Sequence, residues 1–253
     1  MALLPISPVA PAFAVAGNAP ATLAAPLEAA IQDIVDTEGR LAARCGFLQG
    51  QPHGAMTAFN INGQPSMEAH YQLGQTHGPQ RLYDEQGQLL QQTQRIAGLQ
   101  DGLTKTYFST GKLMLEQRHS AGVLNGESVS YAESGDITAK VPYILGKRQG
   151  GAVYFHEGRV IRQENYKAGL LDGDTKDYTP SGSVALLTPY RANVVHGTLK
   201  RFWPNGNPME EVIYRNGKPT GSIRNFDVSG KETAATTAQP GFMKSLEKMM
   251  KGT

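Results

Sequence analysis

The sequence has one cysteine, one tryptophan and few charged residues, and these shortages limit what the protein can be. With Cys45 alone among 253 residues, neither an internal disulfide framework nor a paired-cysteine zinc motif can form. A lone cysteine favours a reducing compartment, so we expect a cytoplasmic protein rather than a periplasmic or secreted one. Charged residues make up 18% and the formal net charge is +2, so no strong field favours nucleic acid as a partner.

Long apolar runs of helical type are also missing. No stretch reaches about 18 uncharged apolar residues, so we expect no transmembrane helix. Residues 1–25 are rich in alanine and proline, and Pro5, Pro8 and Pro11 interrupt the apolar helix that a signal peptide would need. We expect a disordered arm here. A signal peptide is the alternative, because residues 14–16 read Ala-Val-Ala, as a cleavage site does.

Glycine, in contrast, is abundant with 29 residues, and its positions repeat about every 24 residues. Three series of glycines run in phase, and glycine is the residue that turns with positive φ require. The first series has one spacing of 23 and comprises Gly39, Gly63, Gly87, Gly111, Gly135, Gly158, Gly182, Gly206 and Gly230. The second comprises Gly50, Gly74, Gly98, Gly122, Gly146, Gly169, Asn193 and Gly217, where asparagine, which also tolerates positive φ, replaces one glycine. The third comprises Gly54, Gly78, Gly102, Gly126, Gly150, Gly173, Gly197 and Gly221.

Aromatic residues keep the same register. Four residues before the first-series glycines stand Val35, Phe59, Tyr83, Tyr107, Tyr131, Tyr154, Tyr178, Phe202 and Phe226. Eight residues after them stand Phe47, Tyr71, Arg95, His119, Tyr143, Tyr166, Tyr190 and Tyr214. Between the turns, apolar and polar residues alternate with a period of two, which indicates strands. Each unit is therefore a strand, a type I turn closed by a left-handed glycine, a longer strand and a connection.

These patterns predict an all-β fold: an elongated single antiparallel meander of about eight 24-residue β-hairpin repeats over residues 35–230. The one shorter unit lacks a residue between Gly150 and Tyr154, so we expect a local bulge or bend there. The ends of such an array need covering, and residues 26–35 place apolar side chains on one helical face. We expect a short capping helix in that segment.

The C-terminal region is expected to hold a polar linker, residues 231–239, and an amphipathic basic helix, residues 240–252. The apolar face of the helix carries Phe242, Leu246, Met249 and Met250, and the other face Lys244, Lys248 and Lys251. Two interpretations remain open. The helix packs back on the last unit as a cap, or it binds a partner groove or an anionic membrane surface.

No motif in the sequence indicates catalysis. There is no phosphate-binding loop, no dinucleotide fingerprint and no nucleophile elbow. His53, His77 and His196 each precede a third-series glycine, but units about 10 Å apart cannot bring two of them to one metal ion. We therefore expect no metal, no cofactor and no enzymatic activity, and we expect Cys45 to be a half-buried strand residue.

Two sets of aromatic residues are candidates for binding a protein partner. The slot three residues before the turn glycine holds Phe108, Phe155 and Trp203 in alternate units, and aspartate in others, so we expect it to be exposed. The second set, Tyr143, Tyr166, Tyr190 and Tyr214, belongs to the ladder eight residues after the turn glycine, where sheet packing is the favoured interpretation.

The pattern "YFSTGKLMLEQRHSAGVLNG" recurs as "YFHEGRVIRQENYKAGLLDG" and "FWPNGNPMEEVIYRNGKPTG". It resembles the longer bacterial variant of the MORN repeat, over about residues 35–230. Part of that group is similar to antitoxins and to immunity proteins, so the resemblance implies a non-enzymatic module that binds and neutralises a toxin or secreted effector. Other members imply the alternative of a structural or membrane-associated scaffold or a secreted accessory protein. The oligomeric state stays open.

Overall fold

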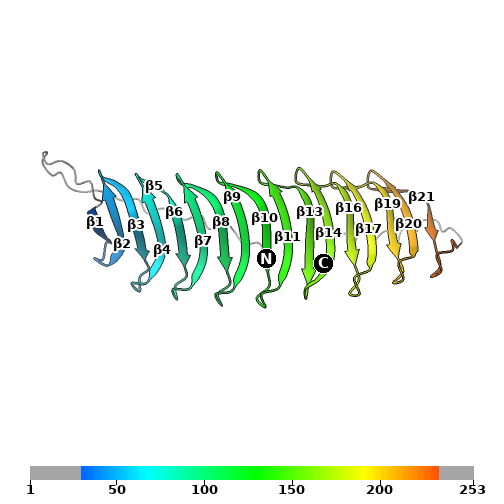
Figure 1. Ribbon diagram of the computed structural model, residues 1–253, viewed down its shortest axis with the longest axis horizontal. Coiled ribbons are helices and arrows are strands. Elements are labelled where there is room, and N and C mark those ends of the chain that lie inside the picture. Colours follow the sequence, from blue (N-terminus) through cyan, green and yellow to red (C-terminus); the bar gives the residue numbers. More distant parts are fainter. Residues whose placement is uncertain (1–29, 234–253) are drawn as a thin grey trace.

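The computed structural model describes residues 30–233, which form one open antiparallel sheet with no helix in that range. The strands stand across the long axis and follow one another in chain order, and each longer strand pairs with the next longer one (Figure 1). The predicted meander of hairpin repeats is confirmed.

The strands have the following bounds: β1 (Ala30–Val35), β2 (Leu41–Leu48), β3 (Gln51–Phe59), β4 (Pro65–Gln72), β5 (Gln75–Thr76), β6 (Gly78–Tyr83), β7 (Leu89–Ile96), β8 (Leu99–Tyr107), β9 (Leu113–Ser120), β10 (Val123–Tyr131), β11 (Ile137–Ile144), β12 (Lys147–Arg148), β13 (Gly150–His156), β14 (Arg159–Lys167), β15 (Leu170–Leu171), β16 (Gly173–Tyr178), β17 (Val184–Arg191), β18 (Val194–Val195), β19 (Gly197–Phe202), β20 (Pro208–Arg215) and β21 (Lys218–Asn225). The four two-residue strands β5, β12, β15 and β18 each continue, after one residue, into the strand that follows.

Five-residue turns join the strands at one long edge of the sheet. In the turn that starts at Asn60, the N–H of Gly63 donates to the carbonyl of Asn60 at 2.9 Å, and Gly63 has a φ of 74°. The side-chain oxygen of Asn60 accepts from the backbone N–H groups of Asn62 and Gln64, both at 3.0 Å. The predicted type I turn with a left-handed glycine is confirmed. The slot three residues before the glycine is the first residue of this turn, which explains its aspartate and asparagine.

Two-residue turns join the strands at the other long edge. Ala121 and Gly122, with φ of 48° and 82°, form one such turn, and two positive φ values in a row define type I′. The N–H of Gly122 donates to the carbonyl of Gln100 in the preceding unit at 2.7 Å. Equivalent bonds repeat along the edge, so consecutive units are linked through their turns as well as through their strands.

The shorter unit differs from the prediction. Phe155 pairs with Val160 and His156 with Arg159, so Glu157 and Gly158 form a two-residue turn. The missing residue lies in this turn, and the bulge or bend expected between Gly150 and Tyr154 is wrong. The register shift beside Phe155 has a counterpart at the same place in other hairpins, for example between Ser130 and Tyr131. The spacing of the glycines shows that one residue is missing from this unit, but it does not show where the deletion lies.

The predicted capping helix is also wrong where it can be compared. Residues 30–35 are strand β1, which pairs along β2 and covers the end of the sheet. The edge of β2 offers partners to the backbone groups of β1 that face it, whereas an isolated helix of ten residues is marginal in water. Ile34 packs on the first apolar cluster, so the apolar residues of this segment still serve the core.

Two apolar clusters lie near the two ends of the sheet. One is built on Ala43, Cys45 and Met56, and the other on Leu186, Val195, Leu199, Val212, Tyr214 and Ile223. At the C-terminal end, residues 231–233 of the predicted linker return along β21, where Phe226 forms a bridge with Glu232. The predicted arm, residues 26–29, the rest of the linker and the predicted helix over 240–252 lie outside the described residues.

Candidate interaction surface

One face of the sheet carries the ladder of residues that stand eight places after the turn glycines, and we call it the tyrosine face. Tyr143 pairs across the strands with Gly126, Tyr166 with Gly150, and Tyr190 with Gly173. The side chains two and four places earlier on the same strand share this face, because side chains alternate along a strand. These rows contain the buried residues of the two clusters, and their central part is polar.

A network of charged and phenolic groups occupies the tyrosine face between the clusters. The carboxylate of Glu164 accepts hydrogen bonds from the hydroxyls of Tyr154 and Tyr166, at 2.9 and 2.6 Å, and from Arg162 Nε at 2.7 Å. Arg162 also donates to Asp177 Oδ1 at 3.0 Å. Burial opposes ionisation of Glu164, but the bonds from Tyr166, Tyr154 and Arg162 together outweigh it and lower its pKa. Glu164 is therefore an ionised anchor for three donors.

Arg148 extends this network toward β11, since its strand position pairs with Tyr143. Its guanidinium lies 5.1 Å from the ring centroid of Tyr166 and donates to the hydroxyl of that residue at 2.8 Å. Tyr143 and Tyr190 flank the network and are half-buried, so part of each ring faces solvent. Burial raises the pKa of Tyr190, which stays a neutral phenol around pH 7. The arrangement presents pre-oriented tyrosine and arginine side chains on a rigid sheet, the residue types most enriched at binding hot spots.

Each predicted aromatic candidate has a defined place. Tyr166 and Tyr214 are 8% and 2% exposed, so Tyr214 is a core residue and Tyr166 presents little surface. Phe108 and Trp203 are half-buried first residues of five-residue turns. Phe155 occupies the position equivalent to Tyr131, as the pairing of the shorter unit shows.

The prediction that Phe108, Phe155 and Trp203 form one row is therefore wrong, because the three residues do not occupy equivalent positions. Phe155 lies on the face opposite the tyrosine face, one strand position before the turn slot. The apolar and lysine residues proposed for the tail, at 242–251, lie outside the described residues.

Two of the histidines before the third-series glycines, His53 and His196, have a structural role. The Nδ1 atoms of His53 and His196 accept hydrogen bonds from the backbone N–H groups of Leu73 and Asn216, at 3.4 and 3.5 Å. Asp101 and Asp172 do the same for Ala121 and Ala192 in other units. In these units the slot links one unit to the two-residue turn of the next. No cluster of three metal-ligating side chains occurs within residues 30–233.

Cys45 is buried, and its thiol donates to the carbonyl of Gly46 at 3.3 Å. Burial raises the pKa of the thiol, which makes it a weaker nucleophile. The residue packs with Ala43 and Met56 in the first apolar cluster.

Sequence reasoning missed the network around Glu164. The signal was present, because Arg162 and Glu164 stand at positions where the preceding unit has Ala139 and Val141. Charged residues at offsets that are otherwise apolar indicate a local polar site. The pattern does not show that Tyr154 belongs to the same face, because a deletion expected before Tyr154 shifts the register of that residue.

Comparison with known proteins agrees with the repeat architecture. Three segments of the chain, residues 76–95, 100–119 and 195–216, match the MORN repeat variant family. MORN repeats are generally modules that interact with proteins or membranes. No curated protein matches this chain. Within residues 30–233 no helix is long and apolar enough to cross a bilayer.

Proposed function

We propose that this chain is a non-enzymatic protein-binding module whose tyrosine face holds a partner protein. The observation that supports this proposal is the network of Arg148, Tyr166 and Glu164, flanked by the half-exposed rings of Tyr143 and Tyr190. Hydrogen bonds fix Arg148, Tyr166 and Glu164 before a partner arrives, so these side chains lose little rotamer entropy on binding.

Within this class we propose an antitoxin or immunity protein that binds and neutralises a cognate bacterial toxin or secreted effector. The resemblance of the repeat unit to the bacterial MORN variant supports this choice. A long single-layer sheet also suits the task, because it offers a continuous rigid surface that can cover much of a second protein.

The experiment begins with co-purification of the chain and the product of a neighbouring toxin-like gene, followed by calorimetric titration of the pair. We expect Tyr143→Ala combined with Tyr190→Ala to weaken the complex about tenfold or more, since truncated hot-spot aromatics cost at least about 2 kcal/mol. Leu187→Ala, a half-buried position on the opposite face, is the control and should leave the affinity unchanged. A complex that withstands the tyrosine double variant would contradict the choice of face.

The alternative function is a membrane-associated scaffold that uses the segment 240–252. Flotation of the full chain and of a 1–230 truncation with anionic liposomes separates the two functions. Flotation that depends on the tail would favour the scaffold, and no flotation of either protein would remove it.

A further inference from the structure

A row of side chains, many of them charged, crosses the face opposite the tyrosine face. Toward both ends of the sheet the cations in this row pair with acids on neighbouring strands. The ion pairs are Arg44 with Asp33 (2.7 Å), Arg81 with Glu68 (3.2 Å), Lys105 with Glu116 (3.7 Å), Lys200 with Glu211 (2.9 Å) and Arg224 with both Glu211 (2.9 Å) and Glu232 (2.8 Å). Charge along the row is therefore balanced at its ends.

The balance fails in the middle of the row. Lys140 stands between Val129 and Val153, and Lys176 between Gln163 and Leu187. Among residues 30–233, neither lysine has a carboxylate within ion-pair distance. Three strand spacings, about 15 Å, separate the two lysines. We call this part of the opposite face, around Lys140 and Lys176, the cationic gap, because its lysines have no acidic partner whereas the cations toward both ends of the row do.

The two-residue turn of the shorter unit opens a notch beside this gap. Elsewhere a side chain of one turn donates to a backbone carbonyl of the next turn, as Asn60 does to Glu85 (3.4 Å) and Lys112 to Glu133 (2.8 Å). Four residues lie between the paired residues Phe155 and Val160, one fewer than the five between Tyr178 and Val184 in the neighbouring unit. A cavity of about 510 Å³ lies between the two turns.

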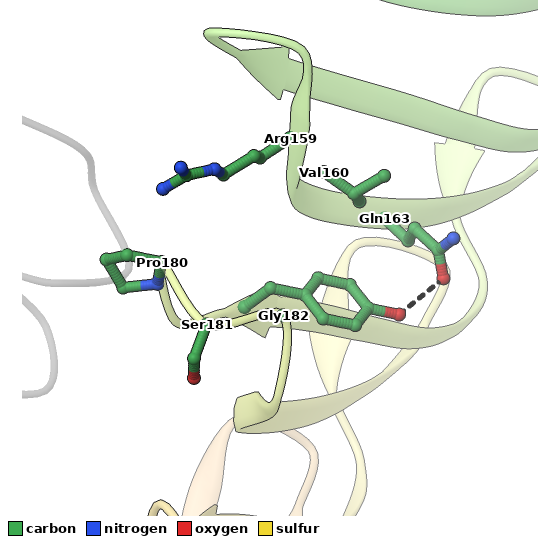
Figure 2. A pocket seen from close by; sticks show the side chains of 7 residues that line it. Arg159, Val160, Gln163, Pro180, Ser181 and Gly182 are labelled. Carbon is green, nitrogen blue, oxygen red and sulfur yellow. Dashed lines mark hydrogen bonds between the residues drawn. The ribbon is translucent and has the colours of Figure 1, made fainter.

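The walls of the notch supply hydrogen-bond donors and an apolar floor. The side chain of Arg159 extends on one side of the cavity and Pro180 lies on the other (Figure 2). The hydroxyl of Tyr178 donates to Gln163 Oε1 at 2.7 Å, which fixes the amide and leaves its two N–H donors free of that bond. No described carboxylate lies within ion-pair distance of Arg159.

A second cavity of about 200 Å³ continues from Gln163 toward the centre of the sheet. It is lined by Val153, Asn165, Asp174 and Lys176 as well as Gln163. The two cavities share Gln163, so together they run from the turn edge to the cationic gap. The lining also contains two acids. The carboxylate of Glu164 is bound on the tyrosine face by Tyr154, Arg162 and Tyr166, and Asp174 stands beyond Lys176 along its strand.

We propose that an extended acidic segment of a partner protein binds in this notch and the adjoining gap. One carboxylate of the segment binds the guanidinium of Arg159, and a second binds Lys176 and the amide of Gln163, which pair across neighbouring strands. Carboxylates are acceptors only and match a site made of donors, and arginine binds them in a bidentate way. An apolar side chain between the two acids packs on the Tyr178 ring between Val160 and Pro180. The site is on the other face from the proposed tyrosine-face interface and does not depend on it.

The test uses the full chain and a fluorescein-labelled peptide, GEEFEEFEEG, with its glutamine counterpart GQQFQQFQQG as the neutral probe. Fluorescence anisotropy should show that the acidic peptide binds and that the neutral one does not. Added salt should weaken the binding, because the contacts are ionic. Arg159→Gln and Lys176→Gln should each lower the affinity about tenfold. Lys218→Gln, which removes the same charge from β21, should have little effect. An equal loss in all three variants, or no binding of the acidic peptide, would overturn the proposal.

A second variant tests the notch without removing any charge. Insertion of one serine between Glu157 and Gly158 gives the turn the length and the Glu-Ser-Gly sequence of the preceding one, at 133–135. The insertion should close the notch and abolish binding, while circular dichroism remains that of the native sheet. Full binding by this variant would show that the peptide binds through surface charge alone. Inhibition of native binding by inorganic phosphate at constant ionic strength would show a simple anion site. Either result contradicts the proposal.

Discussion

The indole N–H of Trp203 donates a hydrogen bond to the backbone carbonyl oxygen of Phe226, at 3.1 Å and across 23 residues of chain. Trp203 begins one turn and Phe226 stands directly before the next, so the bond ties two consecutive units together. The same kind of link recurs beside it, where Asn205 donates to the carbonyl of Val228 at 2.7 Å. The only tryptophan of the chain therefore has a structural role, since its side chain links the last two units by a hydrogen bond.

Substitution Trp203→Phe should lower the free energy of unfolding by about 1 kcal/mol, since it removes one hydrogen bond and keeps most of the apolar ring. Trp203→Ala should cost about 3 kcal/mol at most, because the ring is half-buried and not in a closed core. Urea unfolding followed by circular dichroism measures both. Equal stability of Trp203→Phe and the native chain would show that the bond contributes nothing.

Glu210 is 7% exposed, and its Oε1 atom has no hydrogen-bond partner. Burial raises the pKa of this carboxyl, partly offset by Arg201, so at pH 7 an ionised buried group destabilises the folded state. Glu210→Gln should therefore raise stability at pH 7 by about 1–3 kcal/mol. The gain should shrink as the pH falls through the raised pKa and then below the ordinary value of 4.5, because Glu210 is then protonated in both the folded and the unfolded state. Urea midpoints at pH 7 and pH 4 check this, and a less stable variant at pH 7 would contradict it.

His119 replaces a tyrosine in the ladder, and its Nδ1 atom lies 3.3 Å from the hydroxyl of Thr104. Burial lowers the pKa of His119 below its ordinary value of 6.5. As the pH falls below that value, the unfolded state takes up a proton before the folded state does, so stability should fall. His119→Tyr should remove this dependence between about pH 7 and pH 5. Thermal unfolding of both proteins across that window is the measurement, and parallel pH profiles would exclude this assignment.

Ala121 has a φ of 48°, in the left-handed region that disfavours residues with a Cβ. Asn216, at the equivalent turn position, has a φ of 49°. Ala121→Asn should therefore stabilise the chain by about 0.5–1 kcal/mol, since asparagine tolerates this conformation best after glycine. The adjacent Ser120→Asn, a strand position with no positive φ, is the control and should give no gain. A shift in the urea midpoint shared by both variants would contradict the strain argument.

Much of the fold follows from the sequence because the turns are local. A type I turn closed by Gly63 needs positive φ at one position, and a type I′ turn such as that of Ala121 and Gly122 needs it at two. Glycine in fixed register marks these turns along the chain. Alternation between the turns then fixes which side chains share a face, so the sequence by itself puts Tyr143 and Tyr190 on one face of the sheet. The same alternation predicts that Cys45 lies in a strand with its side chain toward the packed face.

Tertiary structure alone decided where the repeat departs from its own rule. The count of 23 residues between Gly135 and Gly158 fits a deletion on either side of Tyr154, and only pairing of Phe155 with Val160 places it in the turn. Whether residues 30–35 form a helix or a strand depended on the free edge of β2, which is not encoded in those six residues. The notch, the cationic gap and the network on Glu164 each arise from residues in different units, because their contacts form across strands and not along the chain.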